Sequence, residues 1–534
     1  MHSSRMQPVR SLGICCFLAG FAPACDESNA APAAAVVVGP SASPSPSAPL
    51  PERTERDRVA LDGSTRASTP AGGTPGTPRV HAKALRAWIH ARPSRSSERL
   101  GALRAGASLE VAGESVAGDG CPGGFRPVAP KGYVCIGPTA TLDPNDPVVR
   151  LSAPYPPDFT RKLPYIYGTV RNPGPVYGRV PNGAELLASE SDIERRMPAW
   201  LSAEGEIGAS YAQEVWLGRP GTPPDPAAAW AQKTSDAVPE LVRSGSAGML
   251  GEDGAVGTDL LRSRMRPKVG YSFLHTFLHE GRRYGLATDL GVLPTDRLRP
   301  IRGSDFRGVE IGKDVTFPFA FVRRDDARFV RLVRGKLEDA GPADYRSVVP
   351  LTGKQQFFRG RLHYEAKDGT YLADRDASRL DPAKRMPAWG KNGERWLDVN
   401  VTKQTLVAYA GEKPVFATLI STGEAGLDDH EKTTATKLGI FRIHTKYVTA
   451  TMSSDEVGEE FELRDVPYVQ YFEEGYALHG AYWHDRFGTP KSHGCINLSP
   501  EDARRIFFFT EPALPSGWHG VLKPLTGTVV FVHP

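Results

Sequence analysis

Residues 479–498 read HGAYWHDRFGTPKSHGCINL, and this stretch decides what the C-terminal part of the chain can be. It holds one cysteine, Cys495, directly after Gly494, and it offers His479 and His493 as nearby bases. A thiol is a strong nucleophile only as the thiolate, so a cysteine enzyme needs a base beside it. Gly494 leaves room for backbone N–H groups to approach a developing oxyanion. The stretch therefore predicts a nucleophilic cysteine; a structural cysteine among aromatic side chains is the alternative.

The composition of the whole chain favours strands and turns. Of its 534 residues, 55 are Gly and 47 are Pro. A chain of this length is too long to form a single domain around one hydrophobic core. The excess of Gly and Pro favours turns and loops over long helices. We therefore expect a mainly β, multi-domain protein. Alternating apolar residues over 441–447, for example, predict one half-buried strand. The 65 basic and 61 acidic side chains leave a net charge of only +4. The overall charge therefore gives no indication that the protein binds nucleic acid.

The first 25 residues have the pattern of an export signal. Arg5 and Arg10 precede an apolar run, residues 12–22, that ends in small residues and Cys25. The run is too short to span a membrane but fits a secretory signal peptide. The small residues before Cys25 resemble a lipobox, in which this cysteine would carry the lipid; ordinary cleavage nearby is the alternative. We expect an exported protein of the cell envelope or periplasm, lipid-anchored to the inner or outer membrane.

Residues 26–80 are rich in Ala, Pro and Ser. Such a composition cannot bury a core, so we interpret the segment as a disordered tether. The tether would let a lipid-anchored domain reach substrate away from the membrane. A dispensable tail is the alternative.

Residues 81–139 have short apolar runs separated by turns, which predicts a small barrel of short strands. The segment resembles bacterial Src-homology-3-like domains at residues 88–94, 100–106 and 132–135. In an exported chain, Cys121 and Cys135 are expected to form a disulfide. Two cysteines without two further ligands nearby would make a poor zinc site.

The middle region, residues 140–391, is predicted to be β-rich, and its role is open. The segments 359–364 and 368–371 contain turn-forming residues and predict hairpins at the edges of further small barrels. His275 and His279 have the spacing of two zinc ligands on a helix, but the acidic residue follows the second histidine rather than the first. Buried histidines are therefore favoured over a zinc hydrolase. We expect no metal and no cofactor.

At residues 479–498 the sequence closely resembles the L,D-transpeptidase (YkuD) family, whose signature is an upstream His followed by Ser/Thr-His-Gly-Cys, an apolar residue and Asn or Arg. The resemblance implies a C-terminal β-sandwich catalytic domain at residues 392–534. Lys437 stands where the family usually has Pro, which affects a turn near the cleft. Two strand-like segments and a Ser-Thr-Gly sequence support the resemblance, at residues 396–400, 404–409 and 421–423.

The resemblance also implies roles for individual residues. Cys495 would be the nucleophile and His479 the general base, with the backbone carbonyl of Gly480 orienting the imidazole. The backbone N–H groups of Gly494 and Cys495 would hold the oxyanion. The other residues of the pocket would shape it and hold its loop; they are His493, Ser492 and Asn497.

The implied reaction is attack of the thiolate on a peptidoglycan stem tetrapeptide, with release of the terminal D-Ala and formation of a thioester. A stem amine would resolve the thioester into a 3–3 cross-link. Water would give a carboxypeptidase product, and a protein lysine would anchor a protein to the cell wall. The family resemblance further implies acylation by carbapenems. A non-catalytic wall-binding protein and a zinc hydrolase are the alternatives outside this class.

Overall fold

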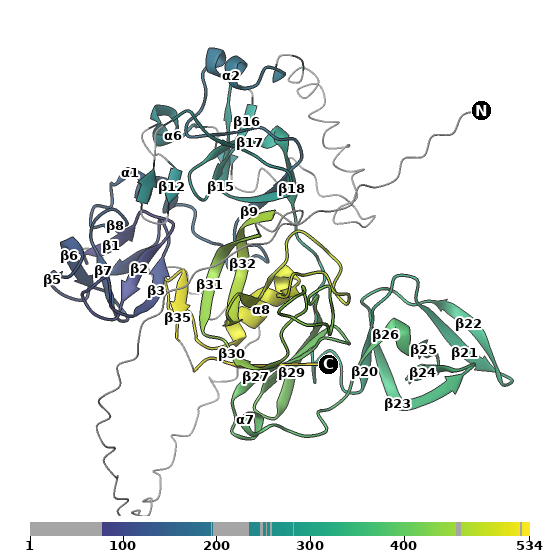
Figure 1. The fold of residues 1–534 in the computed structure, drawn as a ribbon. Helices are drawn as coiled ribbons and strands as arrows, with labels where there is room; N and C mark the ends of the chain where they lie inside the picture. Colours follow the sequence, from purple (N-terminus) through teal and green to yellow (C-terminus); the bar gives the residue numbers. More distant parts are fainter. Residues whose placement is uncertain are drawn as a thin grey trace, which may run out of the picture. The chain divides into compact units, whose positions relative to one another are not determined.

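Strands dominate the part of the chain that the computed structural model describes (Figure 1). All described residues belong to one compact unit of the chain. None of the described helices has the length and hydropathy of a membrane-spanning segment. The predicted signal segment, Cys25 and most of the predicted tether lie outside the described residues. The model describes residues 77–193, 195, 234–235, 237–245, 249–251, 254–256, 259–280, 282–454, 461–523 and 526–534. The prediction of a mainly β, multi-sheet fold is confirmed.

The N-terminal module, residues 77–141, consists of short strands around a small apolar core. Its first strand begins at Arg79, so the last two residues assigned to the tether belong to the fold. Cys121 and Cys135 form a disulfide, with their Cα atoms 5.8 Å apart. The resemblance to Src-homology-3-like barrels stays a prediction. The strands are β1 (Arg79–Ala82), β2 (Ala87–His90), β3 (Arg99–Leu103), β4 (Ser108–Glu110), β5 (Val116–Gly118), β6 (Cys121–Pro127), β7 (Tyr133–Cys135) and β8 (Ala140–Thr141).

The middle region begins with α1 (Pro147–Ser152) and continues into module A, residues 166–301. The strands of module A are β9 (Ile166–Val170), β10 (Pro175–Tyr177), β14 (Leu261–Arg264), β15 (Val269–His279), β16 (Arg282–Ala287), β17 (Val292–Pro294) and β18 (Leu298–Ile301), with the turn η3 (Thr295–Arg297) before β18. An insertion between β10 and β14 carries α2 (Gly183–Ser189), β11 (Thr234–Ser235), α6 (Glu240–Ser244), β12 (Met249–Gly251) and β13 (Gly254–Val256).

Module B, residues 319–380, repeats the strand order of module A. Its elements are β20 (Phe319–Val322), β21 (Arg328–Val333), β22 (Lys336–Pro342), β23 (Val348–Phe358), β24 (Arg361–Ala366), β25 (Tyr371–Ala373), η4 (Asp374–Asp376) and β26 (Ala377–Leu380). β23 begins 79 residues after β15, and every later element keeps this offset. The strand pairings recur as well. In module A, β9 pairs with β15 and β18, and in module B the equivalent strand β20 pairs with β23 and β26. The two modules are therefore a structural duplication.

The hairpin predicted at residues 359–364 is present in module B, where β23 and β24 pair around the turn at 359–360. The second phrase, residues 368–371, contains the turn between β24 and β25. In both places a turn that contains glycine and polar residues joins two antiparallel strands. Turn chemistry therefore located these hairpins in the sequence.

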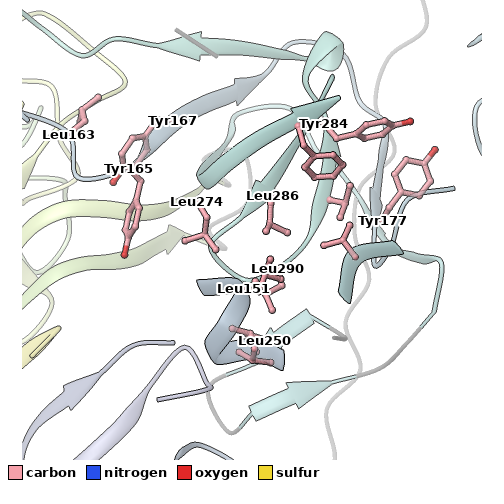
Figure 2. Packing of buried hydrophobic residues seen from close by; sticks show 14 of the residues in the cluster. Leu151, Leu163, Tyr165, Tyr167, Tyr177, Leu250, Leu274, Tyr284, Leu286 and Leu290 are labelled. Atoms are coloured by element: carbon pink, nitrogen blue, oxygen red, sulfur yellow. The ribbon is translucent and has the colours of Figure 1, made fainter. Parts of the chain in front are cut away.

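Module A is joined to the C-terminal domain by strand pairing and by a shared core. β15 pairs in parallel with β32 (Phe461–Glu473). One continuous cluster includes Tyr167 and Leu274 of module A together with Val466 of β32. Figure 2 shows members of this cluster from module A and from the segment that precedes it. A buried carboxylate, Asp465, lies at the same junction and accepts hydrogen bonds from Ser272 and Thr288 of module A.

Asp465 also binds the N-terminal module. The Nη2 atom of Arg104 lies 3.0 Å from Oδ2 of Asp465, and Thr449 of the C-terminal domain donates to Oδ1 at 2.8 Å. Burial alone would raise the pKa of Asp465, but Arg104 and the hydroxyl donors hold it down to about 2. One ionised carboxylate therefore connects the N-terminal module, module A and the C-terminal domain.

The C-terminal domain is a β-sandwich, as predicted, and helix α8 (Pro500–Phe509) packs against its core. One sheet has the order β19 (Val309–Glu310), β29 (Lys413–Leu419), β28 (Thr405–Ala410), β27 (Arg395–Asn400), β36 (Val529–His533) and β30 (Gly439–Arg442). The other contains β31 (Thr445–Ser454), β32, β33 (Tyr476–Gly480), β34 (Ile496–Leu498) and β35 (Gly520–Leu522). The short helix α7 (Ala388–Lys391) precedes the domain.

The prediction of one strand over residues 441–447 is wrong. β30 ends at Arg442 and β31 begins at Thr445, and the two strands belong to different sheets. Phe441 and Ile443 pack into the core between the sheets, whereas Tyr447 belongs to the cluster on the outer face of the second sheet. The chain passes from one sheet to the other between Ile443 and Tyr447. The apolar residues at alternate positions are therefore buried in two different cores and do not share one face of a single strand.

Candidate functional site

Two neighbouring parallel strands, β33 and β34, position the predicted catalytic residues. Leu478 pairs with Ile496, and both enter the core of the sandwich. Side chains alternate along a strand, so His479 and its partner Asn497 point to the opposite face. Cys495 directly precedes β34 and therefore shares that face. By strand geometry the Cα atoms of Cys495 and His479 are roughly 8 Å apart, within reach of an imidazole side chain.

The turn before Cys495 is fixed by hydrogen bonds. The hydroxyl of Ser492 donates to the carbonyl of Cys495 at 2.5 Å and accepts the N–H of Gly494 at 3.1 Å. Thr436 donates to the carbonyl of Gly494 at 2.8 Å. Gly494 has φ +116°, and a Cβ there would lie 2.8 Å from the ring of Tyr476. The position therefore requires glycine, and the turn holds the backbone of residues 492–495 in one conformation.

His493 lies at the same turn with an exposed side chain. Gly480 ends β33 and pairs with Leu498. Asn497 exchanges backbone hydrogen bonds with Ser421, each at 2.9 Å, which ties the site to the Ser-Thr-Gly segment at 421–423. The structure thus brings all the residues of the predicted pocket to the ends of β33 and β34.

Burial sets the protonation states of the predicted pair. His479 is buried, and this lowers the pKa of its imidazole to about 4. Its Nδ1 atom has no hydrogen bond of ordinary geometry with the described residues, although the carbonyl of Gly480 opposes the pKa shift. Burial raises the pKa of the Cys495 thiol to about 11, and its sulfur lies 3.7 Å from the carbonyl of Gly475. Near pH 7 the resting pair is therefore a thiol and a neutral imidazole, which is a base able to accept its proton.

His484 is a further residue of this site that the sequence argument overlooked. Its Nε2 lies 2.9 Å from the side-chain amide of Asn497, and its Nδ1 accepts the N–H of Arg486 at 3.2 Å. Burial, with a smaller contribution from the neighbouring His479, lowers the pKa of His484 to about 3. Because Nδ1 accepts the N–H of Arg486, the neutral ring carries its proton on Nε2, the ring nitrogen that faces the side-chain amide of Asn497. The signal available in the sequence was a third histidine between His479 and His493.

The loop that carries His484 is held by module B. Arg346, between β22 and β23, pairs with Asp485; the distance from Nη2 to Oδ2 is 3.1 Å, and each side chain is about 15% exposed. Ser304 donates a hydrogen bond to the same carboxylate. The hydroxyl of Tyr345 donates to the carbonyl of Phe487 at 2.7 Å. These contacts fix both sides of residues 484–487, next to the predicted base.

The two histidines considered as zinc ligands lie on β15, which is a strand and not a helix. His275 is buried, stacks on Tyr155 with ring centroids 4.3 Å apart, and has a pKa lowered to about 4 by burial. The rings of His279 and Tyr284 are 6.4 Å apart. The described residues contain no group of three or more His, Cys, Asp or Glu side chains able to hold a metal ion.

Comparison with known proteins identifies the C-terminal domain. Residues 394–532 match the model of the YkuD family, described as the L,D-transpeptidase catalytic domain. No curated protein matches the chain. The catalytic domain is therefore of the L,D-transpeptidase type, an acyltransferase domain.

Several solved structures are similar to part of the chain. An L,D-transpeptidase from Enterococcus faecium is 23% identical over 26% of this chain and 50% of its own, with a TM-score of 0.21. One from Stackebrandtia nassauensis is 28% identical over 26% of this chain and 56% of its own, with a TM-score of 0.19. L,D-transpeptidase 3 from Mycobacterium tuberculosis is 18% identical over 34% of this chain and 79% of its own, with a TM-score of 0.21. The chain thus spans about half the length of the first two of these proteins.

Proposed function

We propose that the chain is a peptidoglycan L,D-transpeptidase with Cys495 as its nucleophile. One observation carries this proposal: within the matched catalytic domain, Cys495 and His479 share one face of adjacent strands. A wall-binding protein without activity would not need a buried neutral imidazole beside a thiol. The substrate would be a stem tetrapeptide, attacked at the amide between its third residue and the terminal D-Ala.

In the first step His479 takes the thiol proton, and the sulfur of Cys495 attacks the carbonyl carbon of that amide. The developing oxyanion accepts a hydrogen bond from the N–H of Cys495, which the turn holds in place; the N–H of Gly494, the other expected donor, is donated to the hydroxyl of Ser492 in this structure. The C–N bond then breaks, and the imidazolium returns its proton to the leaving amine of D-Ala. The products of this step are free D-Ala and a thioester on Cys495.

In the second step an amine of a neighbouring stem attacks the thioester carbonyl. A C–N bond forms, the C–S bond breaks, and the amine proton passes through His479 back to the sulfur. The product is a 3–3 cross-link, and the thiol is restored. With water as acceptor the product would be a tripeptide; with a protein lysine it would be a wall-anchored protein.

The proposed location is the cell envelope, with the chain exported and anchored through lipid on Cys25. This part of the proposal comes from the sequence of residues 1–25 and from the tether that follows. It places the catalytic domain beside its polymeric substrate. Metabolic labelling with a fatty acid, compared between the wild type and Cys25→Ala, tests it; labelling of both proteins, or of neither, contradicts it.

The activity is tested with purified protein and stem tetrapeptides. Mass spectrometry should detect free D-Ala and 3–3 linked dimers from the wild type, and neither from Cys495→Ala. Intact-mass measurement should show one carbapenem per wild-type chain, because the strained β-lactam carbonyl is an electrophile for the same sulfur. D-Ala release by Cys495→Ala at the wild-type rate would refute the nucleophile and the transpeptidase proposal together.

A further inference from the structure

Two segments that contact the turn at Cys495 meet each other in an ion pair. Thr436 donates a hydrogen bond of 2.8 Å to the carbonyl that precedes Cys495. In the second segment, the carbonyl of Gly475 lies 3.7 Å from the sulfur. Lys437 follows Thr436 directly, and Glu473 ends β32 just before Gly475. The Nζ atom of Lys437 is 2.6 Å from Oε1 of Glu473, so this ion pair borders the site.

The contacts of Thr436 and Gly475 limit how far the ion pair can lie from the nucleophile. With standard bond lengths added to the hydrogen bond of Thr436, the Cα atoms of Lys437 and Cys495 are at most about 12 Å apart. By the same addition through Gly475, the Cα atom of Glu473 is at most about 13 Å from the sulfur. The two side chains extend about 6 Å and 4 Å from these Cα atoms, so both can approach a substrate held at Cys495.

Electrostatic effects on Tyr476 connect the ion pair with the nucleophile. Burial raises the pKa of Tyr476, Lys437 opposes this rise, and Cys495 adds to it. The ammonium and the sulfur therefore lie within electrostatic reach of one hydroxyl. Glu431 and Glu474 raise the pKa of Tyr476 as well, so the surroundings of the pair also suit a positively charged group.

The ion pair is accessible, and the fold depends little on it. The side chains of Lys437 and Glu473 are 26% and 32% exposed. Ion pairs of this kind contribute at most about 1 kcal/mol to stability. Lys437 also stands where the L,D-transpeptidase family usually has proline, so the cation is a feature of this chain. A role in substrate recognition would account for a charged pair at this place.

We propose that Lys437 and Glu473 bind the side-chain end of the third residue of the donor stem, and that they select a diamino acid with a carboxylate beside its distal amine. Glu473 accepts hydrogen bonds from the distal ammonium, and Lys437 donates to the carboxylate. A lysine in the third position offers the ammonium without the carboxylate. The inference rests on the proposed transpeptidase function and deepens it, because it names the class of donor.

The dimensions of such a donor agree with the position of the ion pair. In the complex before attack, the carbonyl carbon lies about 3 Å from the sulfur of Cys495. An extended diamino acid places its distal charged groups about 8 Å beyond this carbon. The distal groups therefore lie up to about 11 Å from the sulfur, within the range that the two side chains cover.

The test measures D-Ala release by the full-length protein from two stem tetrapeptides that differ only at the third residue, meso-diaminopimelate or L-lysine. In kcat/KM the wild type should prefer the diaminopimelate stem on the order of tenfold, through one charge-assisted hydrogen bond. Lys437→Met should remove this preference by lowering kcat/KM for the diaminopimelate stem alone. Lys437→Glu should reverse it. Glu473→Gln should lower kcat/KM for both stems by a similar factor, because both carry the ammonium.

The matched control is Glu394→Gln. Glu394 pairs with Arg442 at 2.8 Å in an ion pair of similar exposure outside the site, so both stems should react at the wild-type rate. Thermal unfolding shows whether each variant folds, and Lys437→Gln replaces Lys437→Met if the latter does not.

A wild type without preference overturns the proposal. An equal fall for both stems in Lys437→Met also overturns it, because the lysine would then act only on the structure of the site. A wild type that releases D-Ala from neither stem refutes the transpeptidase function itself, before any variant is compared.

Discussion

Replacing His479 with alanine should change both the rate and the pH dependence of acylation at Cys495. The thiol has a pKa of about 11, so about one molecule in ten thousand is ionised at pH 7 without help from a base. The imidazole has a pKa of about 4 and is therefore neutral and ready to accept the proton from pH 5 upwards. Removal of a general base costs about 10²–10⁴-fold in rate, which sets the expected loss at pH 7.

The pH profile separates this mechanism from a merely structural role of the histidine. In the wild type, acylation should be flat from about pH 5 to 9 and fall as the pH decreases through 4, where His479 is protonated. In His479→Ala the rate should depend on the small population of free thiolate. It should therefore rise about tenfold per pH unit between 7 and 10, because the thiol pKa lies above that range.

The assay is the time course of imipenem adduct formation by intact-mass spectrometry. Cys495→Ala should form no adduct, and His493→Ala, at an exposed position of the same turn, should retain most of the rate. Thermal unfolding of each variant shows whether the fold is kept. A folded His479→Ala protein that acylates at the wild-type rate with a flat profile would refute the role of His479 as base.

Three further predictions concern the supports of the site. Arg346→Ala and Asp485→Ala should each slow acylation about tenfold, and the double variant should be no slower than either single one, because both remove the same ion pair; additive losses would contradict this. Asp465→Asn should lower stability by about 3–5 kcal/mol by leaving Arg104 buried without its counter-charge, and an unchanged melting temperature would contradict it. Because the fold lowers the pKa of Asp465 to about 2, its stabilisation is complete above about pH 4 and is lost as the pH falls towards 2, so the stability difference between wild type and Asp465→Asn should shrink over that range. Cys121→Ser should cost about 3 kcal/mol in calorimetry while leaving the acylation rate unchanged, and a slower acylation would argue that the disulfide also supports the site.

The parts of the site predicted from sequence are those encoded locally. The strands at 396–400 and 404–409 have alternating or continuous apolar residues, and they form β27 and β28 with nearly the predicted bounds. The motif around Cys495 places a thiol, a glycine and two histidines within one short stretch. A tight turn and two parallel neighbouring strands are enough to bring such residues to one face. Local pattern therefore predicted Cys495, Gly494 and the two histidines, whereas the roles of Gly480, Ser492 and Asn497 came from the family resemblance.

The supports contributed by distant segments could not be predicted. Arg346 meets Asp485 only because module B contacts the loop after β33. Asp485 lies within residues 479–498, but Arg346 stands in no recognisable motif, so the sequence did not pair the two. The network around Asp465 likewise combines three segments that are far apart in sequence. A single charged residue in a polar stretch has many possible partners, and periodicity does not choose among them.

The duplication of modules A and B was hidden for a different reason. At equivalent turns the chain uses Leu290 with φ +64° in one module and Gly369 with φ +81° in the other. Arg282 and Arg361 are among the few identical pairs at the offset of 79 residues. Hairpin lengths and strand pairing are the same although most side chains differ, because backbone geometry tolerates many residues that keep the burial pattern.

The same topology serves two different purposes in the two modules. The first nine residues of β15 are buried, because this strand pairs with β9 and β16 and also with β32 of the catalytic domain. Its equivalent β23 is exposed at most positions. Module A therefore shares a sheet and a hydrophobic core with the catalytic domain. Substitutions in module A should mainly lower the free energy of unfolding. Module B reaches the active-site loop through the side chains of Tyr345 and Arg346, on the turn between two strands. Truncation of Arg346 removes that contact without opening a core, so a rate change in that variant reports positioning of the loop.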